Sequence, residues 1–153
     1  MGSLLGVSQK CLYALRAMFE LSLRYNNNDA VLTVADISLA QNIPPRFLEQ
    51  IVSKLRTGGY FSSRRGSKGG YILSRPPATV SVGEIIRFIE GDDGLVECLR
   101  KNSRRHCPIE GACVFENLWK SAQAAISGVF DTTTFADLVE KHRQDRDGTD
   151  YCI

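Results

Sequence analysis

Residues for enzymatic chemistry are scarce in this sequence. Its 153 residues include two histidines, His106 and His142. No nucleophile–base pair and no pair of carboxylates stands in a recognisable catalytic motif. We therefore expect a protein that is not an enzyme.

Long apolar runs are missing as well. No apolar stretch approaches the roughly 20 residues that a membrane-spanning helix needs. The N-terminus lacks the cationic stretch and apolar core of a signal peptide. Hydrophobic residues nevertheless make up 43% of the chain and charged residues 24%, which suits one folded domain. We expect a cytoplasmic protein with no membrane partner.

The charge is unevenly distributed. Residues 1–75 carry ten Lys or Arg and four Asp or Glu, a net charge of +6, and residues 76–153 carry nine and thirteen, a net charge of −4. A basic half joined to an acidic half favours contact of the first half with a polyanion such as nucleic acid.

Apolar spacing predicts three helices in the first half of the chain, over 9–25, 33–42 and 45–57. Thr33 and Asp36 form a capping box for the second helix. Pro44-Pro45 starts the third helix, and Gly58-Gly59 ends it. The expected apolar faces are Leu12, Leu15, Met18 and Phe19 in the first helix, Ile37 and Ala40 in the second, and Phe47, Leu48, Ile51, Val52 and Leu55 in the third.

Residues 60–75 change in character. Two short strands, 60–63 and 71–74, flank a glycine-rich tip, which is the pattern of a β-hairpin. A capping box at Ser81 and Glu84 then begins a short buried helix that ends at Gly91.

The second half is organised around a loop over 92–112. A longer helix follows over 114–130, with an apolar side formed by Leu118, Ala122, Ala125, Ile126 and Val129. A capping box at Thr134 and Asp137 begins a last short helix through His142, which we expect at the surface near a helix C-terminus. From Arg143 we expect a polar, mobile tail.

This order of elements predicts a mainly helical α+β fold, a winged helix-turn-helix with a small hairpin wing. A helix fits the major groove, and a cationic hairpin can contact the phosphate backbone or the minor groove. The segment from Arg56 to Arg75, both ends included, contains five cations and no acid. The candidate DNA contacts are Arg46, Glu49, Gln50, Ser53 and Lys54 on the third helix, and Arg64, Arg65, Ser67, Lys68 and Gly69 on the wing.

The sequence resembles the family of bacterial winged-helix repressors that includes IscR, NsrR, RirA and CymR. The resemblance runs from about residue 7 to residue 142 and rests above all on two motifs, Leu48-Glu49-Gln50-Ile51-Val52-Ser53-Lys54-Leu55 and Gly69-Gly70-Tyr71. It implies a homodimer held by the long C-terminal helix, and double-stranded DNA with a palindromic operator as partner. RNA polymerase is a further candidate partner. By the same match Arg46, Glu49 and Gln50 fall where members read bases, although Arg46 stands where members often have a small polar residue.

The chain has five cysteines: Cys11, Cys98, Cys107, Cys113 and Cys152. Without a signal peptide, an odd number argues against a disulfide framework. Three thiols within one loop can converge on iron or zinc, and the cations between Cys98 and Cys107 would offset the negative charge of a ligated cluster. Eight residues separate Cys98 from Cys107, and five separate Cys107 from Cys113, which is not a standard zinc spacing.

The resemblance adds to this interpretation, because cluster-binding members carry three cysteines at this place and non-cluster members such as CymR lack them. It implies a 2Fe–2S or 4Fe–4S cluster on Cys98, Cys107 and Cys113. IscR-like members have a His ligand where this chain has Glu116. NsrR-like members borrow a carboxylate from the partner's first helix near the position of Leu12, beside Cys11. The candidate fourth ligands are Cys11, which we favour, Glu116 and His106, while a lone Cys11 also fits a small buried hydrophobe. Cys152 has no assigned role.

Together these features predict four parts: a DNA-binding domain (1–91, wing about 60–75), a cysteine-bearing sensor loop (92–113), a dimerisation helix with a final short helix (114–142), and a tail (143–153). The predicted function is a homodimeric transcription regulator whose operator affinity depends on an iron–sulfur cluster that senses redox state, nitric oxide or iron. One alternative keeps the DNA binding but uses a cysteine thiol–disulfide or zinc switch. Another is a metal-stabilised protein-interaction module or a cluster carrier.

Overall fold

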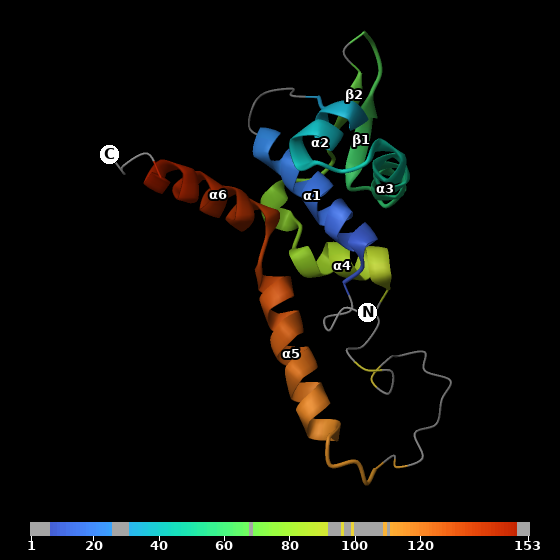
Figure 1. The fold of residues 1–153 in the computed structure, drawn as a ribbon, viewed down its shortest axis with the longest axis vertical. Coiled ribbons are helices and arrows are strands. Elements are labelled where there is room, and N and C mark those ends of the chain that lie inside the picture. Colours follow the sequence, from blue (N-terminus) through green and yellow to red (C-terminus); the bar gives the residue numbers. More distant parts are fainter. Residues whose placement is uncertain are drawn as a thin grey trace.

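The computed structural model describes residues 7–25, 31–67, 69–91, 96, 99, 109 and 111–149. Its fold is mainly helical with a two-stranded wing, which confirms the predicted fold class (Figure 1). In chain order the elements are α1 (Gln9–Arg24), α2 (Val34–Gln41), α3 (Pro45–Thr57), β1 (Phe61–Arg64), β2 (Gly70–Leu73), the 3₁₀ turn η1 (Pro77–Thr79), α4 (Val82–Glu90), α5 (Glu116–Thr132) and α6 (Phe135–Thr149).

Local capping signals fix the ends of α2 and α3. The Thr33 hydroxyl accepts the amide of Asp36 at 3.1 Å, and the Asp36 carboxylate accepts the amide of Thr33 at 2.8 Å, so the predicted capping box is confirmed. Helix α3 has the predicted bounds, with Pro45 in its first turn. The turn after it passes through Gly59 at φ 79°, in the left-handed region that favours glycine.

The wing is an antiparallel pair in which Phe61 lies opposite Leu73 and Arg64 opposite Gly70. Leu32 adds an isolated bridge to Tyr71, with two backbone hydrogen bonds of 3.0 and 2.8 Å. This bridge explains the Gly-Gly-Tyr motif, because a Cβ on Gly70 would lie 2.6 Å from the Leu32 carbonyl oxygen. The base of the wing is therefore fixed to the segment that enters α2.

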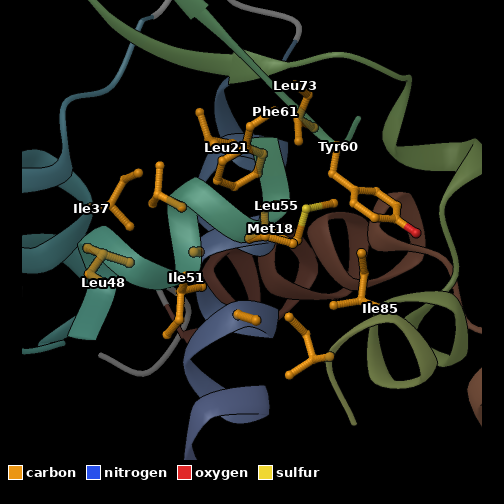
Figure 2. Packing of buried hydrophobic residues seen from close by; sticks show 14 of the residues in the cluster. Met18, Leu21, Ile37, Leu48, Ile51, Leu55, Tyr60, Phe61, Leu73 and Ile85 are labelled. Atoms are coloured by element: carbon orange, nitrogen blue, oxygen red, sulfur yellow. The ribbon is translucent and has the colours of Figure 1, made fainter. Parts of the chain in front are cut away.

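The core lies between α1, α3, α4 and the wing. Figure 2 shows Met18 and Leu21 of α1, Leu55 of α3 and Phe61 of β1 gathered at its centre, and all four are buried. The predicted apolar face of α1 is confirmed at Met18, which is fully buried, and wrong at Leu12, which is 41% exposed. The small residues Cys11, Ala14 and Ala17 are fully buried. Helix α1 has neighbours on several sides, and small side chains let them approach closely.

The predicted faces of α2 and α3 also need correction. Ala40 is exposed, whereas Ile37 is fully buried and the partly buried Val34 packs with it against the core. Phe47 is 59% exposed at the edge of α3, where its ring lies 6.5 Å from that of Tyr13. Leu48, Ile51, Val52 and Leu55 form the buried stripe as predicted.

Helix α5 begins two residues later than predicted and contains no buried residue. It extends away from the winged-helix part of the chain (Figure 1). Its C-terminal end joins α4 through an ion pair of 2.7 Å between Arg87 and Asp131 and a close approach at Gly83, where a Cβ would lie 2.0 Å from an Asp131 oxygen.

Helix α6 is longer than predicted. The Thr134–Asp137 capping box is present, but the helix continues to Thr149, so the prediction of a mobile tail from Arg143 was wrong for residues 143–149. Phe135 and Val139 anchor its first turns in the core, and helix-forming polar residues extend it. His142 therefore lies within the helix, and its ring makes an edge contact of 5.5 Å with Phe19. In the described part of the chain, no helix is long and apolar enough to cross a membrane.

Candidate nucleic-acid interface

The outer surface of α3 carries a polar stripe, which we call the reading face: Arg46, Glu49, Gln50 and Ser53. All four are exposed, and the buried stripe on the opposite side holds the helix against the core. Side chains of these types can reach base edges when a helix enters the major groove. The structure thus brings these four predicted residues together.

Thr57 extends the same stripe, and sequence reasoning missed it. It lies seven residues after Gln50 and eleven after Arg46, spacings that return to one side of a helix. Thr57 is exposed, and its hydroxyl donates to the Ser53 carbonyl at 3.0 Å. Helical periodicity alone could have identified it.

Lys54 does not belong to the reading face. Its side chain is partly buried, its Nζ donates to the Ile89 carbonyl of α4 at 3.1 Å, and the same atom lies 5.4 Å from the centre of the Phe88 ring. The sequence predicts Lys54 as a DNA contact because it is a cation on the expected exposed face of α3. The proximity of α4 directs its ammonium group elsewhere.

The wing carries the second group of predicted contacts. Arg64, Arg65 and Ser67 are exposed, and Gly69 is partly buried. Gly66 has φ 129°, and the amide of Gly69 donates to its carbonyl at 3.0 Å. Lys68 lies outside the described residues. Helix α3 packs against β1, so the wing lies beside the helix that carries the reading face (Figure 1).

Arg75 was counted among the wing cations, but it lies in a network at the wing base. Its guanidinium donates to the Glu84 carboxylate at 2.7 Å and to the Thr79 carbonyl at 2.8 Å. Tyr60 donates to the same carboxylate oxygen at 3.1 Å, and burial together with the Glu84 charge raises the pKa of Tyr60. The capping box predicted at Ser81 is therefore half formed, since Ser81 accepts the Glu84 amide while the Glu84 side chain turns to Tyr60 and Arg75.

The cysteine segment, residues 92–113, is described only in part. Cys113 is half-buried directly before α5, and its carbonyl accepts the amide of Glu116 at 3.2 Å. The Glu116 carboxylate pairs with Lys120 on the next turn. The predicted ligands Cys98 and Cys107, the candidate His106, and Cys152 lie outside the described residues. Within the described ranges, no three metal-ligating side chains come together.

Cys11 is fully buried in the domain core. Burial, and then the nearby Glu90 carboxylate, raise the pKa of its thiol to about 12. A ligand must be a thiolate that can reach its metal. The structure therefore fits the small buried hydrophobe, and it does not offer Cys11 to a partner subunit.

Comparison with known proteins agrees with this architecture. A family profile described as "Rrf2: Iron-dependent Transcriptional regulator" matches residues 7–141. The HTH-type transcriptional regulator IscR of Klebsiella pneumoniae is 32% identical over 133 residues, which cover 87% of this chain and 78% of that protein.

Solved structures give the same picture. CymR, the global cysteine regulator of B. subtilis, superposes with a TM-score of 0.73 at 33% identity and covers 88% of this chain and 96% of its own. IscR of T. potens gives a TM-score of 0.71 at 31% identity over 89% of this chain and 87% of its own.

Proposed function

The chain belongs to the Rrf2 family of DNA-binding transcriptional regulators, and from this premise we propose that an iron–sulfur cluster controls its affinity for an operator. The observation that carries the proposal is the cysteine segment itself. Along the chain, three cysteines lie between the end of α4 and the start of α5. Three soft ligands within one short segment suit iron–sulfur chemistry.

The donors present fit such a cluster. Cys98, Cys107 and Cys113 would hold it, and Cys113 is a half-buried free cysteine just before α5. Glu116 is the fourth-ligand candidate that lies nearest in the described structure, one turn after Cys113. A bound cluster would supply sensitivity to oxidants, nitric oxide and iron supply, since each can dismantle it.

The chain's own residues connect this segment to the DNA-contacting surfaces. Helix α4 ends two residues before the segment begins, and α5 begins three residues after Cys113. The two helices meet through the Arg87–Asp131 ion pair and a hydrogen bond of 2.8 Å from the Val82 amide to the Thr133 carbonyl. Ordering of the segment would therefore fix the angle between α5 and the winged-helix core.

A homodimer completes the proposal. Helix α5 exposes an apolar side on which Leu118 is 55% and Val129 63% accessible, and none of its residues is buried within one chain. A second copy would cover this side and place two reading faces on a palindromic site. A changed α5 angle would then change the distance between the two reading faces, and so the match to half-site spacing.

The experiment is anaerobic purification followed by a visible spectrum and iron and sulfide assays. We expect broad visible absorbance with near-equal iron and sulfide. Cys113→Ala should lose both, while the matched variant Cys11→Ala should keep them. Duplex binding, on DNA selected from a randomised pool by the purified protein, should respond to nitric oxide in the wild type and not in Cys113→Ala.

A colourless protein that also resists anaerobic reconstitution would refute the cluster. Zinc at one equivalent, or a disulfide found by mass spectrometry after oxidation, would then identify one of the alternative switches. Loss of cluster in Cys11→Ala at unchanged stability would refute the ligand set.

A further inference from the structure

A cationic side chain of α3, Lys54, contacts the end of α4. Lys54 donates to the carbonyl oxygen of Ile89 at 3.1 Å. Ile89 is the second-last residue of α4, so its carbonyl belongs to the last turn, where no intrahelical amide is available. A cation at this position also interacts favourably with the negative end of the helix dipole.

The ring of Phe88 makes the same connection. The Lys54 ammonium lies 5.4 Å from the ring centre, within the range of a cation–π interaction. The ring also lies against Gly58, the residue that ends α3, where a Cβ would be only 2.3 Å from its Cζ atom. Phe88, which is partly buried, thus contacts both the end of α3 and Lys54.

The contact continues toward the wing. Tyr60, directly before β1, packs edge to face on Phe88 with ring centres 5.0 Å apart. The Cζ atom of Arg75, just after β2, lies 6.0 Å from the centre of the Tyr60 ring. A continuous series of side chains therefore runs from α3 through the last turn of α4 to both ends of the hairpin.

We propose that Lys54 is a positioning residue for DNA recognition and not a phosphate contact: it holds α3 on the last turn of α4, and Phe88 and Tyr60 extend that constraint to the wing. The inference rests on the DNA binding that the family establishes and does not require a cluster. It assigns Lys54 a positioning role, whereas the exposed wing cation Arg65 is expected to contact a phosphate directly.

Salt dependence separates the two roles. The logarithm of the binding constant falls as the logarithm of the salt concentration rises, and each phosphate contact that is removed makes this slope less steep by about 0.9. A lost positioning contact leaves the slope unchanged but lowers the preference for the selected sequence. The test is binding of Lys54→Met to two duplexes of equal length, one selected from a randomised pool by the wild type and one scrambled, over a range of potassium chloride concentrations.

For Lys54→Met we expect a wild-type slope and a loss on the order of tenfold in the ratio of selected to scrambled affinity. Lys54→Arg should restore the ratio, because a guanidinium can donate to the Ile89 carbonyl and stack on Phe88. Phe88→Leu should reproduce the loss although Lys54 is still present. Arg65→Met is the matched control, and it should make the slope less steep by about 0.9 for each copy of the side chain, or about 1.8 for the proposed homodimer.

A fall in the slope of Lys54→Met comparable to that of Arg65→Met would overturn the proposal. An unchanged ratio and an unchanged slope would overturn it as well. If Lys54→Met does not fold, as judged by far-ultraviolet circular dichroism, Phe88→Leu and Lys54→Arg decide: a normal ratio in Phe88→Leu would refute the positioning role.

Discussion

The thiol of Cys11 is expected to be nearly inert in the folded chain, and the structure sets the magnitude. Its pKa rises from the usual 9.0 to about 12. Thiolate is the reactive form. At a fixed pH near 8 its fraction falls about tenfold for each unit by which the pKa rises, and so by a factor of roughly a thousand. Complete burial of the side chain can only slow the reaction further.

The perturbation is a variant in which Cys98, Cys107, Cys113 and Cys152 are replaced by Ser, so that Cys11 is the remaining thiol. Alkylation by iodoacetamide at pH 8 would be followed by mass spectrometry, with and without urea. We expect labelling in the native chain at about a thousandth of the rate in urea, or slower.

The matched control keeps Cys113 in place of Cys11, with Cys11 changed to Ala. Cys113 is half-buried, so its native rate should approach the rate in urea. A native Cys11 rate within about tenfold of the unfolded rate would show that the thiol is accessible, and would return Cys11 to the candidate ligands.

Three further predictions concern the core, the cap of α6 and the exposed side of α5. Phe61→Ala should lower the free energy of unfolding in urea by about 3–5 kcal/mol because Phe61 is 2% exposed, whereas the same change at the exposed Phe47 should cost less than about 1 kcal/mol; equal losses would contradict the assigned core. Thr134→Ala should lower the melting temperature by about 2–4 °C at neutral pH. The Thr134 hydrogen bonds lower the pKa of Asp137 below its ordinary 3.8, so this stabilisation is present above that pH and is lost as the pH falls below it; a deficit that stays constant down to pH 2 would count against the capping box. Val129→Lys should convert a dimer to a monomer in sedimentation equilibrium with unchanged helix content, and a dimer that persists at micromolar concentration would exclude α5 as the interface.

Local sequence signals located most of the elements. The Pro44-Pro45 start and the Gly58-Gly59 end gave α3 its bounds, and the Thr33 and Thr134 capping boxes gave the starts of α2 and α6. These signals work because a helix end must satisfy its free amides and carbonyls within a few residues. The length of α6 was missed because polar helix-forming residues look the same in a helix and in a tail.

The candidate site was predicted less evenly. Arg46, Glu49, Gln50 and Ser53 were recognised because they alternate with a buried stripe at helical spacing. Lys54 was predicted with them from its place on α3 and its charge, and Arg75 was counted among the cations of the wing region. Cys11 was favoured as a ligand because it lies beside the position where similar proteins supply one. Charge and ligand type say nothing about which neighbour a side chain meets.

The sequence by itself thus determined where α1 to α4 and α6 begin, that a wing follows α3, which family the chain belongs to, and which side of α3 faces solvent. Only the tertiary structure decided that Lys54 meets Ile89, 35 residues later, that Arg75 meets Glu84, and that Cys11 is enclosed in the core. The physical reason is range. Backbone hydrogen bonds at a helix end are closed within one turn, whereas the partner of a long side chain depends on how separate elements pack against each other.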